Sequence, residues 1–379
     1  MKKSLIALAA LAAAGVASAQ SSTTLFGIVD INYAYGKGEG ANCAPGQTTP
    51  CNTKKSQLTS NGYNTSRIGF RGTEDLGGGV TAGFWLEAGL NPDNGQGTAT
   101  NSNNQFSGTG AASNGRQGLV FNRRSTISLS GGFGEVRLGR DYTPQFWNLT
   151  TFDPFGTNGV GTTLTYDSIT GGLINLPTAA RASNSVGYFL PGNLGGFYGQ
   201  VQYSFGENSD PTFNAAGQNI KKDGNGAGFR FGFATGPINV ALAMSKTDYT
   251  SVPNVVGQDV KQNNFGGQFD FGVAKLMGQY SWDTAGDVDG KGYTLGGLVP
   301  VGAGEIKASY SEYKVKLGAE PKSKKLAIGY VHNLSKRTAV YTTYAHLTND
   351  NGASQSLNGS TTTVNGNSNG FDLGIRHSF

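Results

Sequence analysis

The chain has 379 residues, of which 60 are glycine, 16 tyrosine and 21 phenylalanine, against three methionines and three histidines. Aromatic residues favour strands, and glycine favours turns and crowded pleats, so this composition predicts one large sheet. The 29 basic side chains exceed the 24 acidic ones by only five, and this balance gives no support to a protein that binds nucleic acid.

The N-terminus has the organisation of a secretory signal peptide. Lys2 and Lys3 precede an apolar run over 5–16, and Ala17-Ser18-Ala19 forms a small-residue cleavage site before Gln20. We therefore predict a signal peptide over 1–19 and one mature domain over 20–379. The apolar run is shorter than the ~20 residues that a membrane-spanning helix needs, and no other stretch approaches that length. This pattern excludes a helical membrane protein.

Two cysteines, Cys43 and Cys51, lie in a stretch rich in glycine, proline and asparagine. Export places them in an oxidising compartment, so we predict a local disulfide between them. A metal site would need further ligands that this stretch lacks. The sequence predicts neither a metal nor another cofactor.

Apolar and polar residues alternate with a period of two in many segments. The pattern is clear over 25–33, 80–87, 197–205, 228–233 and 275–283. Such alternation indicates strands with one apolar and one polar face. Segments of about ten residues fit the length of a tilted transmembrane strand.

Short and long connections follow one another along the chain. Seven short connections have tight-turn composition: 77–79, 131–134, 191–196, 235–237, 272–273, 301–304 and 335–337. Eight longer segments lie between them: 37–64, 92–121, 144–182, 207–225, 250–262, 284–291, 316–323 and 349–368. Fifteen connections predict sixteen strands, with both termini on the side of the short turns, which is the periplasmic side of bacterial barrels.

The last strand ends on an aromatic residue. Phe371, Leu373, Ile375 and Phe379 are apolar, whereas Asp372 and Arg376 between them are charged. This pattern is typical of the last strand of a bacterial outer-membrane barrel. We predict an all-β fold, a 16-stranded antiparallel transmembrane β-barrel wide enough to leave an aqueous lumen. A secreted solenoid or adhesin shares the richness in glycine and strands, but it explains neither the alternating connections nor Phe379.

Several motifs resemble the general diffusion porins of Gram-negative bacteria, in the branch typical of beta-proteobacteria. They lie over 24–30, 66–77, 122–123, 129–134, 138–140, 184–188, 334–338 and 374–379. The resemblance implies a homotrimer in the outer membrane, surrounded by its lipids, in which each barrel has its own water-filled pore for passive diffusion of ions and small hydrophilic solutes. It also implies that the barrel-assembly machinery reads Phe379.

The resemblance further implies that the third surface loop folds into the barrel and narrows the pore. Here that loop is the longest connection, 144–182. The turn composition of 152–156 could bend it inward, and long loops without their own structure are usually functional or mobile. An ordinary exposed loop is the alternative.

Strand parity assigns several arginines to the lumen. Ile68 and Phe70 face lipid in the second strand, so Arg67 and Arg71 face the lumen, and the same argument places Arg137, Asp141 and Arg181 inside. At the start of the fourth strand, strict alternation places Arg124 inward and Arg123 outward, whereas the family pattern favours Arg123 as the wall residue. A β-bulge could reconcile the two, and both residues stay candidates.

These arginines carry the prediction of anion preference. A charged cluster facing Asp153 or Asp141 across the lumen would create a transverse field that sorts solutes by charge. For any single arginine, a rim charge or a salt bridge that holds the loop is an equally good interpretation. As a group, they outnumber the acids on the inward loop, so the sequence predicts a pore that prefers anions.

Catalysis finds little support in the sequence. His332, His346 and His377 form no recognisable pair with a nucleophile, and we expect no enzyme; an outer-membrane barrel hydrolase is the catalytic alternative. A substrate-specific channel, for example for sugars, is the closer alternative. It would line its path with aromatic side chains, and the inward Trp85 and Tyr198 are few and scattered.

Overall fold

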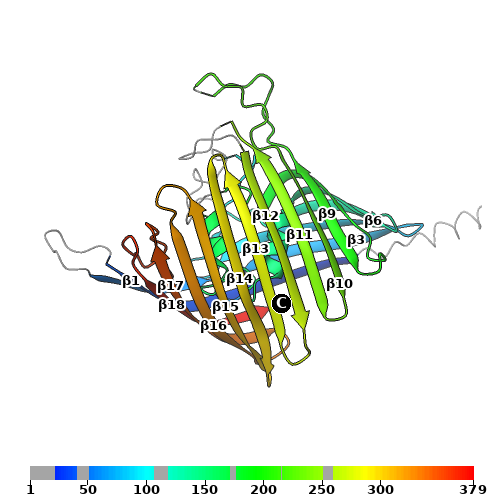
Figure 1. Cartoon of the computed structure of the whole chain (residues 1–379). Coiled ribbons are helices and arrows are strands. Elements are labelled where there is room, and N and C mark those ends of the chain that lie inside the picture. The colour runs from blue at the N-terminus through cyan, green and yellow to red at the C-terminus, as the bar shows by residue number, and fades with distance from the viewer. Residues whose placement is uncertain (1–21, 41–50, 106–117, 171–175, 215, 251–258) are drawn as a thin grey trace, which may run out of the picture.

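The computed structural model describes residues 22–40, 51–105, 118–170, 176–214, 216–250 and 259–379. The predicted signal peptide and Cys43 lie outside the described residues. Sixteen of the strands form a closed antiparallel barrel (Figure 1). They are β1 (Ser22–Glu39), β3 (Arg67–Gly77), β4 (Val80–Asn91), β6 (Arg124–Gly131), β7 (Gly134–Tyr142), β8 (Arg181–Phe189), β9 (Phe197–Ser204), β10 (Gly226–Thr235), β11 (Ile238–Asp248), β12 (Asp259–Asp270), β13 (Lys275–Ala285), β14 (Val288–Val301), β15 (Gly304–Lys316), β16 (Lys322–Asn333), β17 (Thr338–Asp350) and β18 (Ser368–Ser378).

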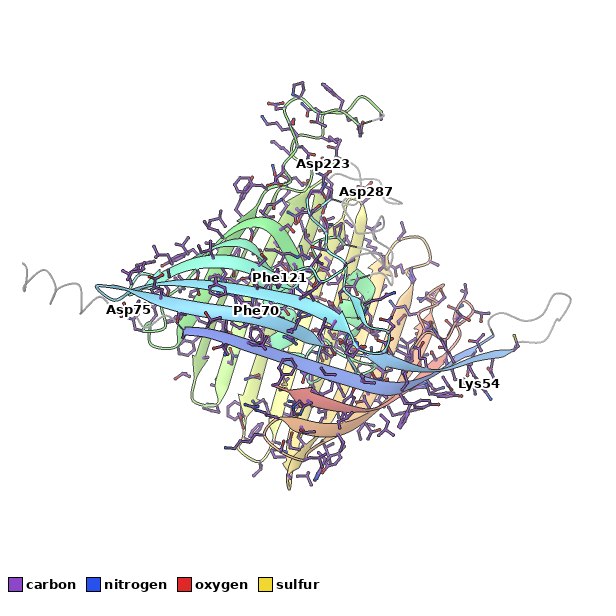
Figure 2. All side chains as sticks on the ribbon, turned by 180° about the vertical axis from the view of Figure 1, so that it is seen from behind. Lys54, Phe70, Asp75, Phe121, Asp223 and Asp287 are labelled. Atoms are coloured by element: carbon purple, nitrogen blue, oxygen red, sulfur yellow. The ribbon has the colours of Figure 1, made fainter. Side chains whose placement is uncertain are left out.

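Two further strands belong to surface loops. β2 (Asn52–Ser60) pairs with the second half of β1, while β3 pairs with its first half. β2 therefore lengthens the first hairpin beyond the barrel wall, and Figure 2 shows Lys54 of β2 and Asp75 of β3 at opposite ends of the molecule. β5 (Gln96–Gly97) makes a small hairpin with the end of β4.

The first and last strands close the barrel. β1 pairs with β18 from Ile28↔Ser378 to Gly38↔Ser368. Phe379 extends this ladder, because its backbone N–H donates to the Gly27 carbonyl at 3.0 Å and its carbonyl accepts from the Gly27 N–H at 3.1 Å. Closure removes the sheet edges that lipid could not hydrogen-bond.

The alternation seen in the sequence matches the two faces of the wall. Leu25, Val201, Leu276 and Ile375 are all exposed on the outer surface. Residues of the opposite parity on the same strands point into the barrel, where Asp30, Gln200 and Asp372 are buried. The outer surface is thus apolar and the inner surface polar, as a barrel in lipid requires.

The connections follow the predicted order, but several of the longer ones are shorter than expected. β13 and β14 are separated only by Gly286 and Asp287, although we expected a loop over 284–291. β12 already begins at Asp259, within the loop predicted over 250–262, and the loop predicted over 316–323 shrinks to 317–321. The one predicted over 37–64 contains β2. Strands continue through these segments because cross-strand pairing satisfies their backbone groups above the membrane as well as within it.

The third loop, L3 (143–180), contains the helices of the described chain, which the sequence did not predict. α2 spans Pro144–Thr151 and α3 spans Leu164–Ile169. Pro144 fits the first turn of α2, where its missing N–H costs nothing, and the Thr163 side chain caps α3 by accepting from the Thr165 N–H. No helix among the described residues is long and apolar enough to cross a bilayer.

Candidate functional site

L3 lies inside the barrel, as predicted, and is attached to the inner face of the wall. Asn148 of α2 donates to the Ala241 carbonyl of β11 at 3.0 Å and to Oδ1 of Asn264 on β12 at 2.8 Å. Further along, the Thr163 and Thr294 hydroxyls are 2.5 Å apart, and the Val160 N–H donates to Asp372 of β18. These contacts lead L3 along the wall from β11 to β18.

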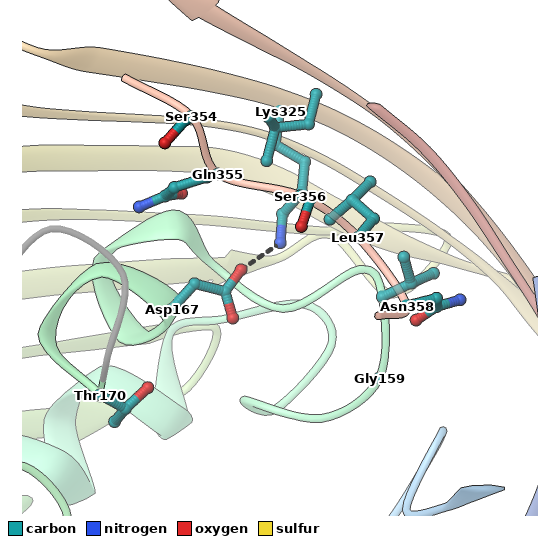
Figure 3. A pocket seen from close by; sticks show the side chains of 11 residues that line it. Gly159, Asp167, Thr170, Lys325, Ser354, Gln355, Ser356, Leu357 and Asn358 are labelled. Carbon is teal, nitrogen blue, oxygen red and sulfur yellow. Dashed lines mark hydrogen bonds and ion pairs between the residues drawn. The ribbon is translucent and has the colours of Figure 1, made fainter. Parts of the chain in front are cut away.

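An ion pair fastens the α3 end of L3. Lys325 of β16 extends from the wall, and its Nζ lies 2.6 Å from Oδ2 of Asp167 (Figure 3). The Lys325 side chain is almost completely buried. Residues 354–358 of the eighth loop, L8 (351–367), cover the same recess, and Gln355 donates to Ser168 of α3. L8 and the wall therefore hold α3 from two sides.

Glycines on the inner wall make room for L3. A side chain at Gly266 of β12 would clash with the Phe152 ring, and a Cβ at Gly296 of β14 would lie 2.8 Å from Cγ of Pro154. Here glycine is used for the close approach of a loop to the wall. Part of the high glycine content thus serves L3 rather than turns.

Three arginines meet on the wall opposite this attachment, and we call Arg67, Arg123 and Arg181 the arginine cluster. Glu87 of β4 binds two of them: its Oε1 lies 2.5 Å from Nε of Arg123 and 3.3 Å from Nη1 of Arg67. The Tyr142 hydroxyl accepts from Arg123 at 2.5 Å and from Arg181 at 3.0 Å. Three guanidinium groups thus face one carboxylate, which leaves the cluster with a net charge of +2.

Arg123 and Arg124 both point into the lumen. Arg124 is paired with Glu87 in the β4–β6 ladder and has the inward parity that strict alternation predicts. Arg123 comes just before β6, where alternation does not yet apply, and its side chain turns inward to Glu87. The two expectations derived from parity and from the family pattern are therefore compatible.

A second group of charges lies on the same wall nearer the short turns. Arg137 lies 2.5 Å from Asp141 and 2.9 Å from Glu135, and Arg124 lies 3.8 Å from Asp141. Two arginines and two acids balance here. Asp141 is on the same wall as the arginines, so it does not face them across the lumen. Arg71 is exposed, and its guanidinium lies 5.1 Å from the Trp85 ring.

Asp153 is turned into L3 instead of facing the arginine cluster. Its carboxylate accepts from the backbone N–H groups of Phe155 (3.0 Å), Thr157 (2.9 Å) and Thr163 (3.0 Å). Burial raises the pKa of this carboxyl. The sequence placed an acid opposite the arginines, but the N–H groups of L3 hold that acid inside the loop.

Additional basic residues face the lumen from other strands. Lys307 of β15 lies 4.6 Å from the Tyr63 ring, and Arg376 of β18 lies 5.3 Å from the same ring. Arg230 of β10 donates to Oδ1 of Asn148 at 3.0 Å and so supports α2. One cavity of about 590 Å³ is lined by the arginine cluster, Lys307 and the L3 segment 153–158.

The sequence analysis did not single out Glu87, Tyr142, Lys307 or Arg230 as site residues. Parity could have found Lys307, because it lies between the outward Ile306 and Ala308. Tyr142 could not be found in this way, since its role depends on where L3 leaves β7. It stacks on Phe146 of α2 at 4.9 Å and lies in edge contact with Trp147 at 5.0 Å.

A barrel of sixteen strands has the architecture of a diffusion channel when its third loop lies inside it beside a cavity lined by arginines, and the comparisons agree. The family model of the Gram-negative porin matches residues 5–352. The chain belongs to the Gram-negative porin family. It is 38% identical to outer membrane porin protein 32 of Delftia acidovorans over the full length of both chains. It is 30% identical to an outer membrane porin protein of Bordetella pertussis, over 90% of this chain and 93% of the relative.

A solved structure is similar over nearly the whole porin. The anion-selective porin from Comamonas acidovorans is 36% identical, with a TM-score of 0.77 over 95% of this chain and 100% of that one. The porin is thus an outer-membrane channel for passive diffusion, and the predicted family and fold are confirmed. Within the described ranges, no three histidine, cysteine or acidic side chains come together as a metal site.

Proposed function

We propose that this porin prefers anions and that the arginine cluster is the main cause. The observation that carries the proposal is the imbalance at the constriction: Arg67, Arg123 and Arg181 face only Glu87, and Lys307 adds a charge to the same cavity. Arginine stays charged at any relevant pH. An anion entering the cavity is attracted and a cation is repelled. The similar porin from Comamonas acidovorans is described as anion-selective, which supports the proposal.

The other candidate residues have different roles in this proposal. Arg124, Arg137 and Asp141 form a balanced group with Glu135 and contribute little net field. Arg71 is an exposed charge beside the path. Asp153 shapes L3 and does not act as a selectivity charge, since three backbone N–H groups bind it.

We also propose the assembly that the family implies. The mature chain begins at Gln20, forms a homotrimer among outer-membrane lipids, and is inserted by the barrel-assembly machinery, which reads Phe379. The proposed channel works without catalysis, and the absence of lipase activity in the purified protein is the corresponding expectation.

The test of anion preference is a reversal potential in a dilute KCl gradient across a planar bilayer. The wild-type channel should favour chloride. The double variant R67Q/R123Q leaves Glu87 without its two arginine partners and should move the reversal potential towards potassium, while conductance persists. A wild-type channel that favours potassium in dilute salt would contradict the proposal and leave the porin family assignment intact.

A substrate-specific channel remains a second candidate because of one observation. Tyr142, Phe146 and Trp147 pack together beside the arginine cluster and line the same cavity. These rings could bind the apolar face of a sugar. Saturable block of the ion current by a sugar would favour this candidate over general diffusion.

A further inference from the structure

The chain between β2 and β3 lies against the inner wall of the barrel, and we call residues 61–66 the inner segment. Gly62 and Ser66 of this segment are buried. Its other four side chains are partly exposed and line the cavity that contains the arginine cluster: Asn61, Tyr63, Asn64 and Thr65. Part of the first surface loop thus borders the same space as L3.

One acid of the wall holds the inner segment. Oδ2 of Asp30 on β1 accepts from the backbone N–H groups of Tyr63 at 3.0 Å and of Asn64 at 2.5 Å. Oδ1 of the same carboxylate accepts from the Tyr341 hydroxyl of β17, and the Asp30 N–H donates to the Ser66 hydroxyl oxygen at 2.9 Å. Asp30 is completely buried and forms no ion pair within the described ranges. Its carboxylate is therefore satisfied by the inner segment and by Tyr341.

The inner segment is packed between the wall and the tip of L3. A Cβ at Gly62 would lie 2.5 Å from the Tyr341 hydroxyl oxygen, and a Cβ at Gly159 of L3 would overlap the Gly62 carbonyl oxygen. The Thr65 hydroxyl donates to Oδ1 of Asn158 at 2.8 Å. Such close approach needs glycine on both sides of the contact. The tip of L3 thus rests on the inner segment.

The inner segment also orients one member of the arginine cluster. Arg67 follows it directly in the chain, and Nε of Arg67 donates to the Thr65 carbonyl at 2.8 Å. Nη1 of the same guanidinium faces Glu87 at 3.3 Å. A displacement of the inner segment would therefore move Arg67 and disturb the contact with L3 together.

Tyr63 is the largest side chain that the inner segment presents to the cavity. Its ring centroid lies 5.5 Å from that of Tyr341, 4.6 Å from Nζ of Lys307 and 5.3 Å from Cζ of Arg376. The two cations are close enough to interact with the ring face. The Tyr63 hydroxyl forms no hydrogen bond with another described residue. The ring is therefore held by contacts from three strands, β15, β17 and β18.

We propose that the inner segment is a second constriction element beside L3. In this element Tyr63 limits the size of the solutes that pass, and Asp30 is the positioning residue that holds Tyr63 in the pore. L3 and the inner segment meet at Asn158 and Thr65 and border the same cavity. Because the Tyr63 ring carries no charge, this size limit is separate from the ion preference of the arginine cluster.

The experiment measures swelling rates of liposomes that contain the full mature chain. The solutes are arabinose and the larger raffinose, because neutral sugars respond to the width of a pore and not to its charges. Y63A removes the ring, and Y63F keeps it. Y203A removes a tyrosine exposed on the outer surface and is the matched control. Circular dichroism shows that each variant has folded.

We expect Y63A to raise the ratio of the raffinose rate to the arabinose rate about twofold or more, since pore diameter sets the size limit. Y63F and Y203A should stay near the wild-type ratio. An unchanged ratio in Y63A would overturn the role of Tyr63. An equal rise in Y63F or in Y203A would overturn it as well, because neither variant removes the ring from the cavity.

The positioning role of Asp30 is tested with D30N. The amide has one acceptor oxygen where the carboxylate has two, so the N–H groups of the inner segment or the Tyr341 hydroxyl lose their acceptor. D30N should raise the ratio as Y63A does, and it should add little in the background of Y63A. Y341F removes one donor from Asp30 while keeping the ring beside Tyr63; it should raise the ratio less, and it serves as the test if D30N does not fold.

A purely structural role of Asp30 would give a different result. D30N would then lower the thermal stability and leave the ratio of swelling rates unchanged, which would overturn the positioning role. An equal rise on adding D30N to the wild type and to Y63A would show that Asp30 does not act through Tyr63, and it would also overturn that role. If D30N does not fold, an unchanged ratio in Y341F has the same meaning.

Discussion

Replacing Arg181 by glutamine removes one charge from the arginine cluster without leaving an acid unpaired. Arg181 donates to the Arg123 carbonyl and to the Tyr142 hydroxyl, and it forms no ion pair within the described residues. Glu87 keeps both of its arginine partners. R181Q therefore tests the field of the arginine cluster more cleanly than a change at Arg67 or Arg123.

The size of the effect follows from the cavity. A volume of about 590 Å³ equals that of a sphere about 5 Å in radius. At about 5 Å in water, a unit charge contributes about 0.8 kcal/mol, and screening at 0.1 M salt leaves about 0.5 kcal/mol. Because anions and cations respond with opposite sign, R181Q should lower the chloride-to-potassium permeability ratio about fivefold. At 1 M salt the Debye length is about 3 Å, and the change should be less than about twofold.

The assay is the reversal potential of single channels at both salt concentrations. R181K keeps the charge and should keep the wild-type ratio, and R337Q removes an arginine at a short turn as a control for net charge. An unchanged reversal potential of R181Q in dilute salt would refute the reasoning. An equal shift in R181K would show that the geometry of the guanidinium, and not its charge, is responsible.

Three further predictions concern L3, the disulfide and the last residue. D153A deprives three backbone N–H groups of their acceptor, at about 1 kcal/mol or more for each, so single-channel recordings should show more frequent closures; an unchanged closure rate would contradict the structural role. The pKa of Asp153 is raised in docked L3, so docked L3 binds the proton more tightly than free L3. Ionisation of Asp153 at neutral pH therefore lowers the free energy that holds L3 in place, and that free energy is regained as the pH falls through the raised pKa. Wild-type closures should thus not increase on acidification towards the ordinary carboxyl range. Non-reducing peptide mapping of outer-membrane material should recover Cys43 linked to Cys51, a bond that stabilises the loop by roughly 2 kcal/mol or more; two free thiols would disprove it. F379A should lower the yield in the outer membrane while the protein still folds in detergent, and an unchanged yield in cells would speak against the assembly signal.

The wall of the barrel was predictable from the sequence because its physics is local. Each strand must present alternate side chains to lipid and to water, and the outward Leu25, Phe70 and Leu276 show that requirement in the sequence. The same parity assigned Arg67, Arg137 and Arg181 to the inner face, and their side chains contact Glu87, Asp141 and Tyr142 there. Only the predicted lengths of some loops were wrong. Strands that pair above the membrane need no apolar face, so the sequence alternation does not mark where they end.

The interior arrangement was less predictable because contacts distant in the sequence determine it. Asp153 lies in a segment of turn composition, and only the folded loop shows that its carboxylate binds N–H groups of L3. The direction of the Arg123 side chain could not be predicted, because it depends on where the β4–β6 ladder begins. The path of L3 depends on partners such as Asn264, which is more than a hundred residues away from Asn148.

The glycines under L3 mean that the bore of the channel depends on positions that solutes never touch. Gly266 and Gly296 have no side chains, and Phe152 and Pro154 of L3 occupy the space that side chains would fill. Alanine at Gly266 would push the Phe152 ring towards the axis and reduce the conducting cross-section. Two porins with identical constriction residues can therefore differ in conductance, because residues behind the loop adjust the diameter.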